Sequence, residues 1–273
     1  MASGMWEASG KSTRPKLGES RIMLSAQAEQ LFVNSYITNL DQDFALKRIG
    51  EWYNLNLLDH VPKVNGAIPL HPGHYDFLEN HLYYKSHAKY GRALLDFMSV
   101  GWYLTADKSV EWVALTNHLP MLTAGQAPVY VSDQQALDAI TDETFQPRKA
   151  VYLPEAAHGF ITVTNTSACD VTNVQFSAER VEADIAAASA TMAVISQTYY
   201  HLWQAYVDGN PVPLFRANVA FQAFEVPAGK HHIEVVYRDH NLSMGALLTA
   251  IALALCGLIW YKLREVPLTQ TGI

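Results

Sequence analysis

The sequence predicts an α+β protein with a mixed helix and strand N-terminal part, an antiparallel β-sandwich-like domain and one C-terminal transmembrane helix. Two observations indicate this fold class. Residues 151–241 contain about seven short apolar segments separated by turn residues, a density typical of a β-sandwich. Residues 242–261 form an apolar run without one charged side chain, and this run is long enough to cross a bilayer.

Composition and pattern divide the chain into five ranges. They are a flexible tail at 1–20, a mixed α/β extracytoplasmic segment at 21–150, the β-sandwich-like domain at 151–241, the transmembrane helix at 242–261 and a cytoplasmic tail at 262–273. With 49% hydrophobic and 16% charged residues, the chain is not a disordered protein. Its net charge of -7 and the lack of a long basic run argue against a nucleic-acid partner.

From Arg21 to about Tyr90 the pattern is mixed and mostly helical, and residues 110–131 are expected to be strand and loop. Asp41 is placed to cap a helix that carries Phe44, Ile49, Trp52 and Tyr53. The Pro- and Gly-rich segment from Val61 to Gly73 must be largely loop, and a short helix through Leu94, Leu95 and Met98 precedes a strand. Ser132 with Gln135 three residues later is a capping box that begins another helix.

The most regular β pattern runs from Tyr199 to Arg238. Asp208-Gly209-Asn210 lies between two apolar runs, a strong signal for a hairpin turn, and Pro227–Lys230 supplies a second turn. After it, Ile233, Val235 and Tyr237 fall on one face of a strand. Alternating or continuous apolar patterns predict further strands at 161–164, 174–177, 180–185 and 192–195.

The apolar run at 242–261 reads as a membrane helix. Twenty residues with a rise of about 1.5 Å each cover roughly 30 Å, the thickness of a bilayer core. Trp260 and Tyr261 fit an interfacial aromatic belt, and Lys262 and Arg264 follow directly. By the positive-inside tendency, the C-terminus is cytoplasmic and the globular part lies outside. The alternative is a buried core helix.

Alanines at 246, 250 and 254 form a stripe of small residues that favours contact with other transmembrane helices.

The first twenty residues are polar and show no apolar region of a signal peptide. Two arrangements are compatible with this. Either the chain is a tail-anchored, non-enzymatic binding module facing the cytosol, or it is the end of a larger membrane protein whose earlier helices are not in this sequence. The small-residue stripe favours the second arrangement.

A resemblance supports the second arrangement. The segment TYYHLWQAYVDGNPVPLFRANVAFQAFEVPAGKHHIEVVYR, which continues into the apolar run, resembles the C-terminal end of the YfhO-type bacterial membrane proteins. Their pattern there is YYPGW-x-A-x-VDG followed by NxxFxAxxVPxGxHxVxxxY. Three upstream segments, at 94–100, 117–120 and 145–153, resemble the family's LLxxxNVRY, NxxxLPR and FDPxxxVxL, so the resemblance covers roughly residues 90–262. His201-Leu202 replaces the usual Pro-Gly, and Met121 replaces the usual Arg.

Membership of this family implies a membrane protein with a glycosyltransferase-C-like helical core that transfers sugar from a lipid-linked donor to cell-envelope polymers. The family's acidic catalytic residues lie in extracytoplasmic loops between N-terminal helices, which this sequence does not contain, so the resemblance assigns no catalytic residue here. The implied partners are the lipid bilayer, other transmembrane helices, and carbohydrate or a lipid-linked sugar. The implied location is the bacterial cell membrane, with the soluble part extracytoplasmic and the C-terminus cytoplasmic.

Four aromatic residues are the candidate substrate-binding residues, because aromatic faces stack on sugar rings: Tyr199, Tyr200, Trp203 and Tyr206. The alternative is that they anchor the core of the sandwich, since a strand exposes only alternate residues. Asp208 is interpreted as a turn residue and not as a catalytic acid.

The best metal-ligand candidates are a group of histidines and carboxylates, namely His71, His74, His81, His87, Asp76 and Glu79. Pro72 and Gly73 interrupt a regular helix there, and the spacing fits no zinc pattern. We therefore predict neither a metal site nor a cofactor. Motifs of hydrolases, NTPases, dinucleotide-binding proteins and zinc ribbons are absent from the sequence.

Overall fold

The computed structural model of the chain describes residues 15–35, 37–67, 72–84, 91–106 and 109–264. Contacts divide the chain into two compact units, Met1–Val236 and Tyr237–Ile273. Most of the tail expected at 1–20 lies outside the described residues. The division of the chain into five ranges stays a prediction, whereas the α+β fold class is confirmed by the elements described below.

The first unit begins with a mixture of helices and short strands. They are β1 (Arg21–Leu24), α2 (Ala26–Asn34), α3 (Leu40–Ile49), η1 (Leu55–Asp59), α4 (Gly73–Glu79), η2 (Asn80–Tyr84), α5 (Arg92–Phe97), β2 (Val100–Thr105), β3 (Glu111–Ala114), β4 (Leu122–Tyr130) and α6 (Asp133–Thr141). Strands then dominate: β5 (Ala150–Leu153), η3 (Glu155–Phe160), β6 (Cys169–Phe176), β7 (Arg180–Ala187), β8 (Thr191–Ile195), β9 (Trp203–Val207), β10 (Asn210–Val212), β11 (Phe215–Ala217), β12 (Phe221–Val226) and β13 (Gly229–Tyr237). The second unit contains α7 (His240–Arg264).

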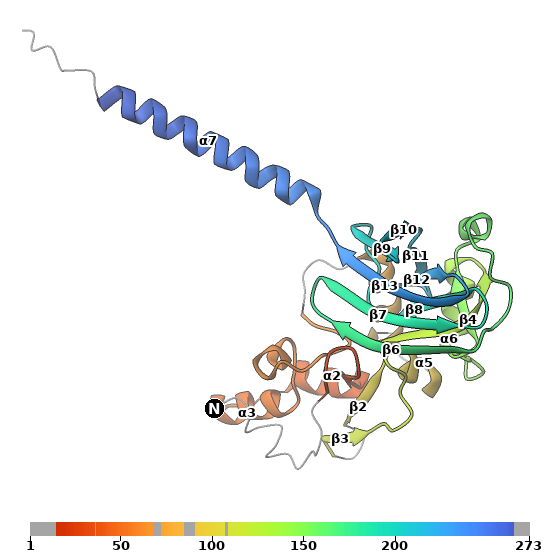
Figure 1. Cartoon of the computed structure of the whole chain (residues 1–273). Coiled ribbons are helices and arrows are strands. Elements are labelled where there is room, and N and C mark those ends of the chain that lie inside the picture. Colours follow the sequence, from red (N-terminus) through yellow and green to blue (C-terminus); the bar gives the residue numbers. More distant parts are fainter. Residues whose placement is uncertain (1–14, 36, 68–71, 85–90, 107–108, 265–273) are drawn as a thin grey trace, which may run out of the picture. The chain divides into compact units, whose positions relative to one another are not determined.

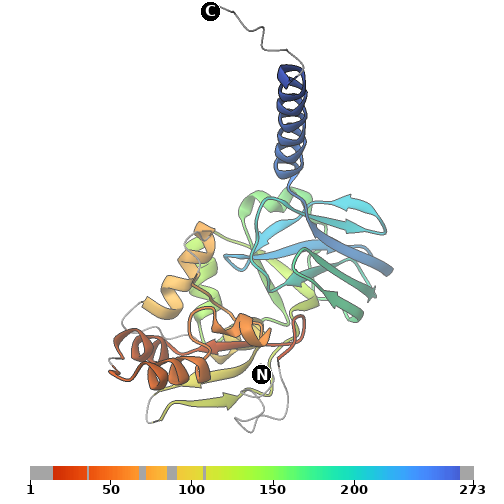
Figure 2. The same ribbon diagram turned by 90° about the vertical axis from the view of Figure 1, so that its left-hand side faces the viewer.

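The described strands form three sheets that are mostly antiparallel. One has three strands in the order β1-β2-β3, and the other two have five strands each, β10-β9-β13-β7-β6 and β11-β12-β8-β4-β5. Among the strand pairs whose register the structure gives, β1–β2 and β4–β5 are parallel and the others are antiparallel. The two larger sheets face each other as a sandwich, with β13, β7 and β6 in front of β8 and β4 in Figure 1. Figure 2 shows the same layers from the side.

The core lies on both faces of the sheet β11-β12-β8-β4-β5. All five residues of β8 are buried, which identifies it as a central strand covered on both sides. On one side, Met192, Val194 and Phe221 pack with Phe97 of α5 and Leu137 of α6 in one apolar cluster. On the other side lies the second large sheet, which presents alternate buried residues of β7 and β13. The helices α5 and α6 thus form a third layer.

Local patterns in the Tyr199–Arg238 stretch are confirmed. β9 and β10 are antiparallel neighbours, and Asn210 lies opposite Val207. The turn between them therefore has two residues. Asp208 and Gly209 both have positive φ, 51° and 77°, the geometry of the I′ turn that suits a right-twisted hairpin. Ile233 and Val235 are fully buried, as the alternation predicts.

The strand predicted at 174–177 is present as the end of β6, and Val174 is 38% exposed because a bulge with Asn173 at positive φ interrupts the alternation. Two other expectations about local structure were wrong. Residues 161–164 form no strand, because the backbone N–H and the hydroxyl of Thr162 bind the Glu225 carboxylate in place of a sheet ladder. The cap of α3 is Asn39, whose side chain accepts from the N–H groups of Asp41 and Gln42 at 3.0 and 3.2 Å.

The predicted capping box of α6 is present and allows a first test. The Ser132 hydroxyl accepts from the Gln135 N–H. In turn, the Ser132 N–H donates to the side-chain oxygen of Gln135 at 3.0 Å. We expect Ser132→Ala to lower the free energy of unfolding by about 1 kcal/mol, because one helix N–H loses its partner. Urea denaturation measures this loss. Ser132→Asp keeps a capping oxygen and should retain stability; equal losses in both variants would contradict the assignment.

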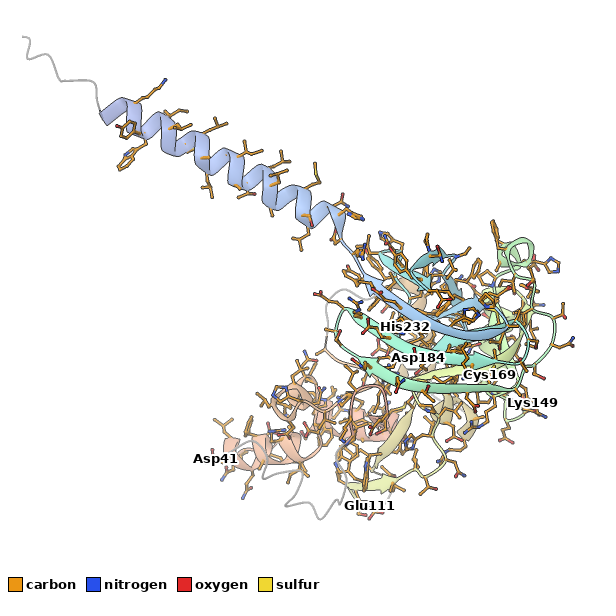
Figure 3. All side chains as sticks on the ribbon, viewed as in Figure 1. Asp41, Glu111, Lys149, Cys169, Asp184 and His232 are labelled. Carbon is orange, nitrogen blue, oxygen red and sulfur yellow. The ribbon has the colours of Figure 1, made fainter. Side chains whose placement is uncertain are left out.

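The second unit is one long apolar helix. The stretch His240–Lys262 of α7 has a mean hydropathy of 2.3, and by length and composition it could cross a membrane. Its side chains are exposed, as the rows of sticks along the helix in Figure 3 show. None of this stretch is buried as the structure describes it, so the alternative of a buried core helix gains no support.

Candidate functional site

Three segments that are distant in the sequence meet at a cleft of about 290 Å³ in the first unit. We call it the α5 cleft. Its lining comes from α5, from the loop after β3 and from the segment before β5, and consists of Ala93, Asp96, Asn117, Leu119 and residues 146–149. These are the segments whose sequences resemble the upstream YfhO patterns. The structure therefore brings together three parts of that pattern that lie more than 20 residues apart along the chain.

Backbone bonds and aromatic packing fix the walls of the α5 cleft. The N–H of Leu119 donates to the carbonyl of Asp96 at 2.8 Å, which ties the loop after β3 to the end of α5. Phe145 is buried with its ring 6.0 Å from that of Phe97, which anchors the third segment. The Gln126 amide donates to the Pro147 carbonyl at 3.1 Å. The cleft is therefore preformed.

The charges in the α5 cleft favour an anionic ligand. The Asp96 carboxylate is bound to Arg92 of its own helix at 2.8 Å. Arg148 and Lys149 are exposed, and neither forms an ion pair with another residue that the structure describes. Lys149 lies at the surface in Figure 3. With the Asn117 amide beside them, these two cations can hold a phosphate or carboxylate group.

The four predicted aromatic residues do not lie on one surface. The Trp203 side chain faces the sandwich core and is 8% exposed, on the same face of β9 as Ala205 and Val207. Tyr206 lies on the opposite face of β9, and its hydroxyl donates to the Gln204 side chain at 2.7 Å. Tyr200 is 40% exposed and Tyr199 is half-buried before the strand. A sugar platform would therefore use the three tyrosines; their role in binding stays a prediction.

The outward face of the sheet β10-β9-β13-β7-β6 carries paired polar side chains. His232 and Asp184 lie on adjacent strands, with Nδ1 2.8 Å from Oδ1, and Figure 3 shows them side by side. Asn173 donates to the other oxygen of Asp184 at 2.6 Å. Arg180 bridges Glu182 and Glu234 at 2.7 and 3.1 Å. Because these side chains bond to one another, the face is polar, but its side chains do not point to one common position as catalytic groups would.

Asp208 is a turn residue with a structural role. Its carboxylate accepts from the His232 N–H at 2.9 Å and lies 2.6 Å from Nδ1 of His231. The other ring nitrogen of His231 lies 3.1 Å from the Ala228 carbonyl, so protonation of both nitrogens satisfies both contacts. The carboxylate and the carbonyl raise the pKa of His231, and the bonds from His231 and from the His232 N–H lower the pKa of Asp208.

These shifts predict a pH window for the Asp208–His231 contact. The contribution of His231 is complete below its ordinary pKa of about 6.5 and is lost as pH rises through the higher folded value. The contribution of Asp208 is present above its ordinary value and is lost as pH falls through the lower folded value. The contact therefore stabilises the hairpin most between the two ordinary pKa values, 3.8 for Asp208 and 6.5 for His231.

Replacing Asp208 by Asn tests this window. Asparagine tolerates positive φ and keeps the turn, but it removes the negative charge. We expect the pKa of His231 to fall towards its ordinary value in Asp208→Asn, as followed by NMR titration of the imidazole protons. Asp184→Asn is the matched control, because Asp184 contacts His232 and not His231. An unchanged His231 titration in Asp208→Asn would refute the contact.

Among the described residues, the candidate metal ligands do not form one group. His74 lies 3.8 Å from Asp133, whose carboxylate is held more closely by Arg216 at 2.8 Å. Within residues 15–264 as described, no three His, Cys, Asp or Glu side chains come together as a metal-binding group. His71 and His87 lie outside the described residues.

A buried ionic cluster escaped the sequence analysis. Arg48 lies 3.0 Å from Glu51 and 2.7 Å from Asp59, and all three side chains are less than 10% exposed. Burial, together with a hydrogen bond to Asp59, raises the pKa of Glu51 to about 8. No spacing rule predicts this cluster, because Glu51 and His60 adopt positive φ on either side of η1 and turn the chain back on itself.

A comparison with known protein families relates the β-sandwich to one of them. Residues 159–249 match the family described as bacterial membrane protein YfhO. The match covers a third of the chain, from η3 through the strands β6 to β13 and into α7. The YfhO resemblance inferred from the Tyr199–Arg238 stretch is thereby confirmed for this range. Searches of curated proteins and of solved structures found no match.

The YfhO match and α7 together support association of the chain with a membrane. The matched range contains the outward polar face, the Asp208 turn and the three tyrosines. It does not include the segments that line the α5 cleft. The likeness of those segments to YfhO patterns therefore stays a prediction from the sequence.

Proposed function

We propose that the chain forms the extracytoplasmic domain and a membrane helix of a YfhO-type glycosyltransferase. In this role it presents a lipid-linked sugar or a cell-envelope polymer to a catalytic centre that lies on other membrane helices. One observation carries the proposal: the range that matches YfhO begins in the globular domain and continues into the apolar helix α7. The chain itself then needs no catalytic centre.

The α5 cleft supports this role by its charge. A lipid-linked sugar carries phosphate between the sugar and the lipid, and Arg148 and Lys149 offer two cations next to the Asn117 amide. We expect the purified chain to bind a polyprenyl phosphate more tightly than the matching polyprenol. The double variant Arg148→Gln/Lys149→Gln should lower that preference about tenfold, which corresponds to about 1.4 kcal/mol. Lys230→Gln on β13 is the control for a surface charge elsewhere.

A pair of reporters fused after Ile273 tests the orientation. Green fluorescent protein at this position should fluoresce and alkaline phosphatase should be inactive, because the proposal places the C-terminus in the cytoplasm. Active phosphatase would overturn the arrangement. Sugar transfer by the isolated chain would also contradict the proposal. Exposure of the globular domain to an external protease in intact cells separates this arrangement from the tail-anchored module that faces the cytosol.

A further inference from the structure

Four large apolar side chains on α3 and η1 are exposed. Leu40 is 82% exposed, Phe44 57%, Leu57 64% and Leu58 54%, and we call these four residues the apolar rim. One exposed leucine needs no explanation, but a group of them on neighbouring elements marks a contact with another protein or with a membrane. Asp41 of α3 lies at the outer edge of the first unit in Figure 3, so α3 is a surface helix. None of the assignments above uses the apolar rim, which precedes the range that matches YfhO.

The apolar rim is one continuous surface. Its two members on α3 are four residues apart, so they lie on the same face of that helix. Arg48 follows one turn later in the same row, and its guanidinium lies 2.7 Å from the buried carboxylate of Asp59 at the end of η1. The two leucines of η1 directly precede Asp59 and flank its inward face. The ion pair therefore joins the two halves of the rim.

The cations of α3 are already paired, so the rim offers apolar contact and little free positive charge. The Lys47 ammonium lies 2.8 Å from the Asp43 carboxylate and 4.8 Å from the centroid of the Trp52 ring. Arg48 is held between two buried carboxylates. A neutral lipid surface suits such a rim, because apolar side chains of helices that lie on a membrane enter the boundary between headgroups and acyl chains.

A bilayer is the partner that the chain itself holds near the first unit. β13 ends at Tyr237 and the candidate span of α7 begins at His240, with Arg238 and Asp239 between them. Two residues extend over at most about 7 Å. The membrane that α7 enters is therefore present at a high effective concentration, which a partner free in solution does not have.

The N-terminal layer contacts the end of the sandwich from which β13 leaves the first unit. Val236 is opposite Arg180 on β7, and Val181 is opposite Phe176 on β6, so Phe176 and the end of β13 share one end of the sheet. The Phe176 ring packs against Gly18, where an added Cβ would lie 2.8 Å from a ring carbon. The chain continues from there into β1 and α2. The layer that carries the apolar rim is thus attached at the end that the short linker holds near the bilayer.

We propose that the apolar rim of α3 and η1 lies on the bilayer that α7 enters and forms a second contact between the chain and the membrane. Its leucine and phenylalanine side chains enter the boundary between headgroups and acyl chains, and the Arg48 ion pairs keep α3 and η1 together beneath them. The proposal depends on insertion of α7 and not on the proposed role in sugar transfer.

Quenching by lipids tests the proposal on the full chain in phosphatidylcholine nanodiscs that contain nitroxide-labelled lipid. The parent carries Cys169→Ser and Cys256→Ser, and single cysteines labelled with an environment-sensitive fluorophore replace Leu57 on the rim, Asp138 on the exposed side of α6 or Leu255 within α7. We expect the probe at Leu57 to be quenched at least about twofold more strongly than the probe at Asp138. Quenching of the probe at Leu255 verifies that α7 is inserted.

Charges placed on the rim should remove the contact. Phe44→Glu/Leu58→Glu should lower quenching at Leu57 to the level at Asp138 and leave quenching at Leu255 unchanged. Phe44→Leu/Leu58→Met keeps the apolar surface and serves as the control. Because both side chains are exposed, the urea midpoints of these variants should match that of the parent.

Two results would overturn the proposal. One is quenching at Leu57 no stronger than at Asp138 while the probe at Leu255 is quenched. The other is a blue shift at Leu57 without quenching by the labelled lipid, because protein and not lipid would then cover the rim.

Discussion

Two arginines in the middle of α7 are expected to remove the chain from the membrane. Ile251 and Leu255 lie near the centre of the apolar stretch His240–Lys262 and one helical turn apart. Replacing an aliphatic side chain by Arg at the centre of a membrane helix costs about 3 kcal/mol, so the double variant Ile251→Arg/Leu255→Arg loses about 6 kcal/mol of insertion free energy.

Flotation of membranes in a density gradient measures this effect, because it separates inserted protein from aggregates. The parent chain should float with the lipid, and the double-arginine variant should stay at the bottom. The swap Ile251→Leu/Leu255→Ile keeps the apolar surface and serves as the control. A double-arginine variant that floats like the parent would show that α7 is not the membrane anchor.

Removing Arg48 is expected to destabilise the first unit by about 3–5 kcal/mol, the usual cost of breaking a buried ion pair. Arg48 is bound to Glu51, to Asp59 and, through Nη1, to the carbonyl of Leu55 at 3.3 Å. Without the guanidinium, the carboxylate of Asp59 is left in a site where its side chain is 1% exposed. The urea midpoint of Arg48→Ala, followed by fluorescence, measures the loss. Arg92→Ala is the control, because Arg92 is 47% exposed in its pair with Asp96 and should cost less than about 1 kcal/mol.

The Glu51 partner makes the stability of this cluster depend on pH. Its folded pKa of about 8 lies above the ordinary value of 4.5, so its contribution to stability is complete below pH 4.5 and is lost as pH rises from there through about 8. Glu51→Gln keeps a neutral hydrogen-bonding group of the same size. We expect this variant to flatten the decline in stability between about pH 4.5 and pH 8. An identical decline in the variant and the parent chain would contradict the assignment.

The parts of the fold that local chemistry decides could be predicted from the sequence. Asp208-Gly209 requires positive φ at two successive residues, and Ser132 with Gln135 satisfies a helix end within four residues. The continuous apolar run at 192–195 predicted a strand, and β8 is found there with all five residues buried. The long apolar helix α7, a candidate membrane span, could be predicted from the length of the apolar run and its lack of charged residues.

The failures arise where a distant side chain replaces a local bond. Ile161–Thr164 alternates like a strand, but the Glu225 carboxylate, about sixty residues away, binds Thr162 and removes the need for a ladder partner. The tertiary environment there overrides a pattern that is correct locally. For Trp203 the sequence left two roles open, a sugar platform or a core anchor, and the register of β9 places its side chain in the core.

The α5 cleft lay beyond sequence reasoning for a physical reason. It joins Asp96, Asn117 and Arg148 from three segments. Their proximity depends on packing of helices and loops and not on spacing along the chain. For the α5 cleft, the YfhO-like patterns at 94–100, 117–120 and 145–153 were the one available signal.

The central claim is that the β-sandwich lies outside the cell and α7 crosses the membrane with its C-terminal side in the cytoplasm. Labelling of single cysteines with a membrane-impermeant maleimide in intact cells tests it most directly. The parent carries Cys169→Ser and Cys256→Ser, and one cysteine is added at exposed Glu179 or at Gln270 beyond the helix. The account predicts that Glu179→Cys is labelled in intact cells and Gln270→Cys only after permeabilisation. Labelling of Gln270→Cys in intact cells, with Glu179→Cys protected, would contradict it.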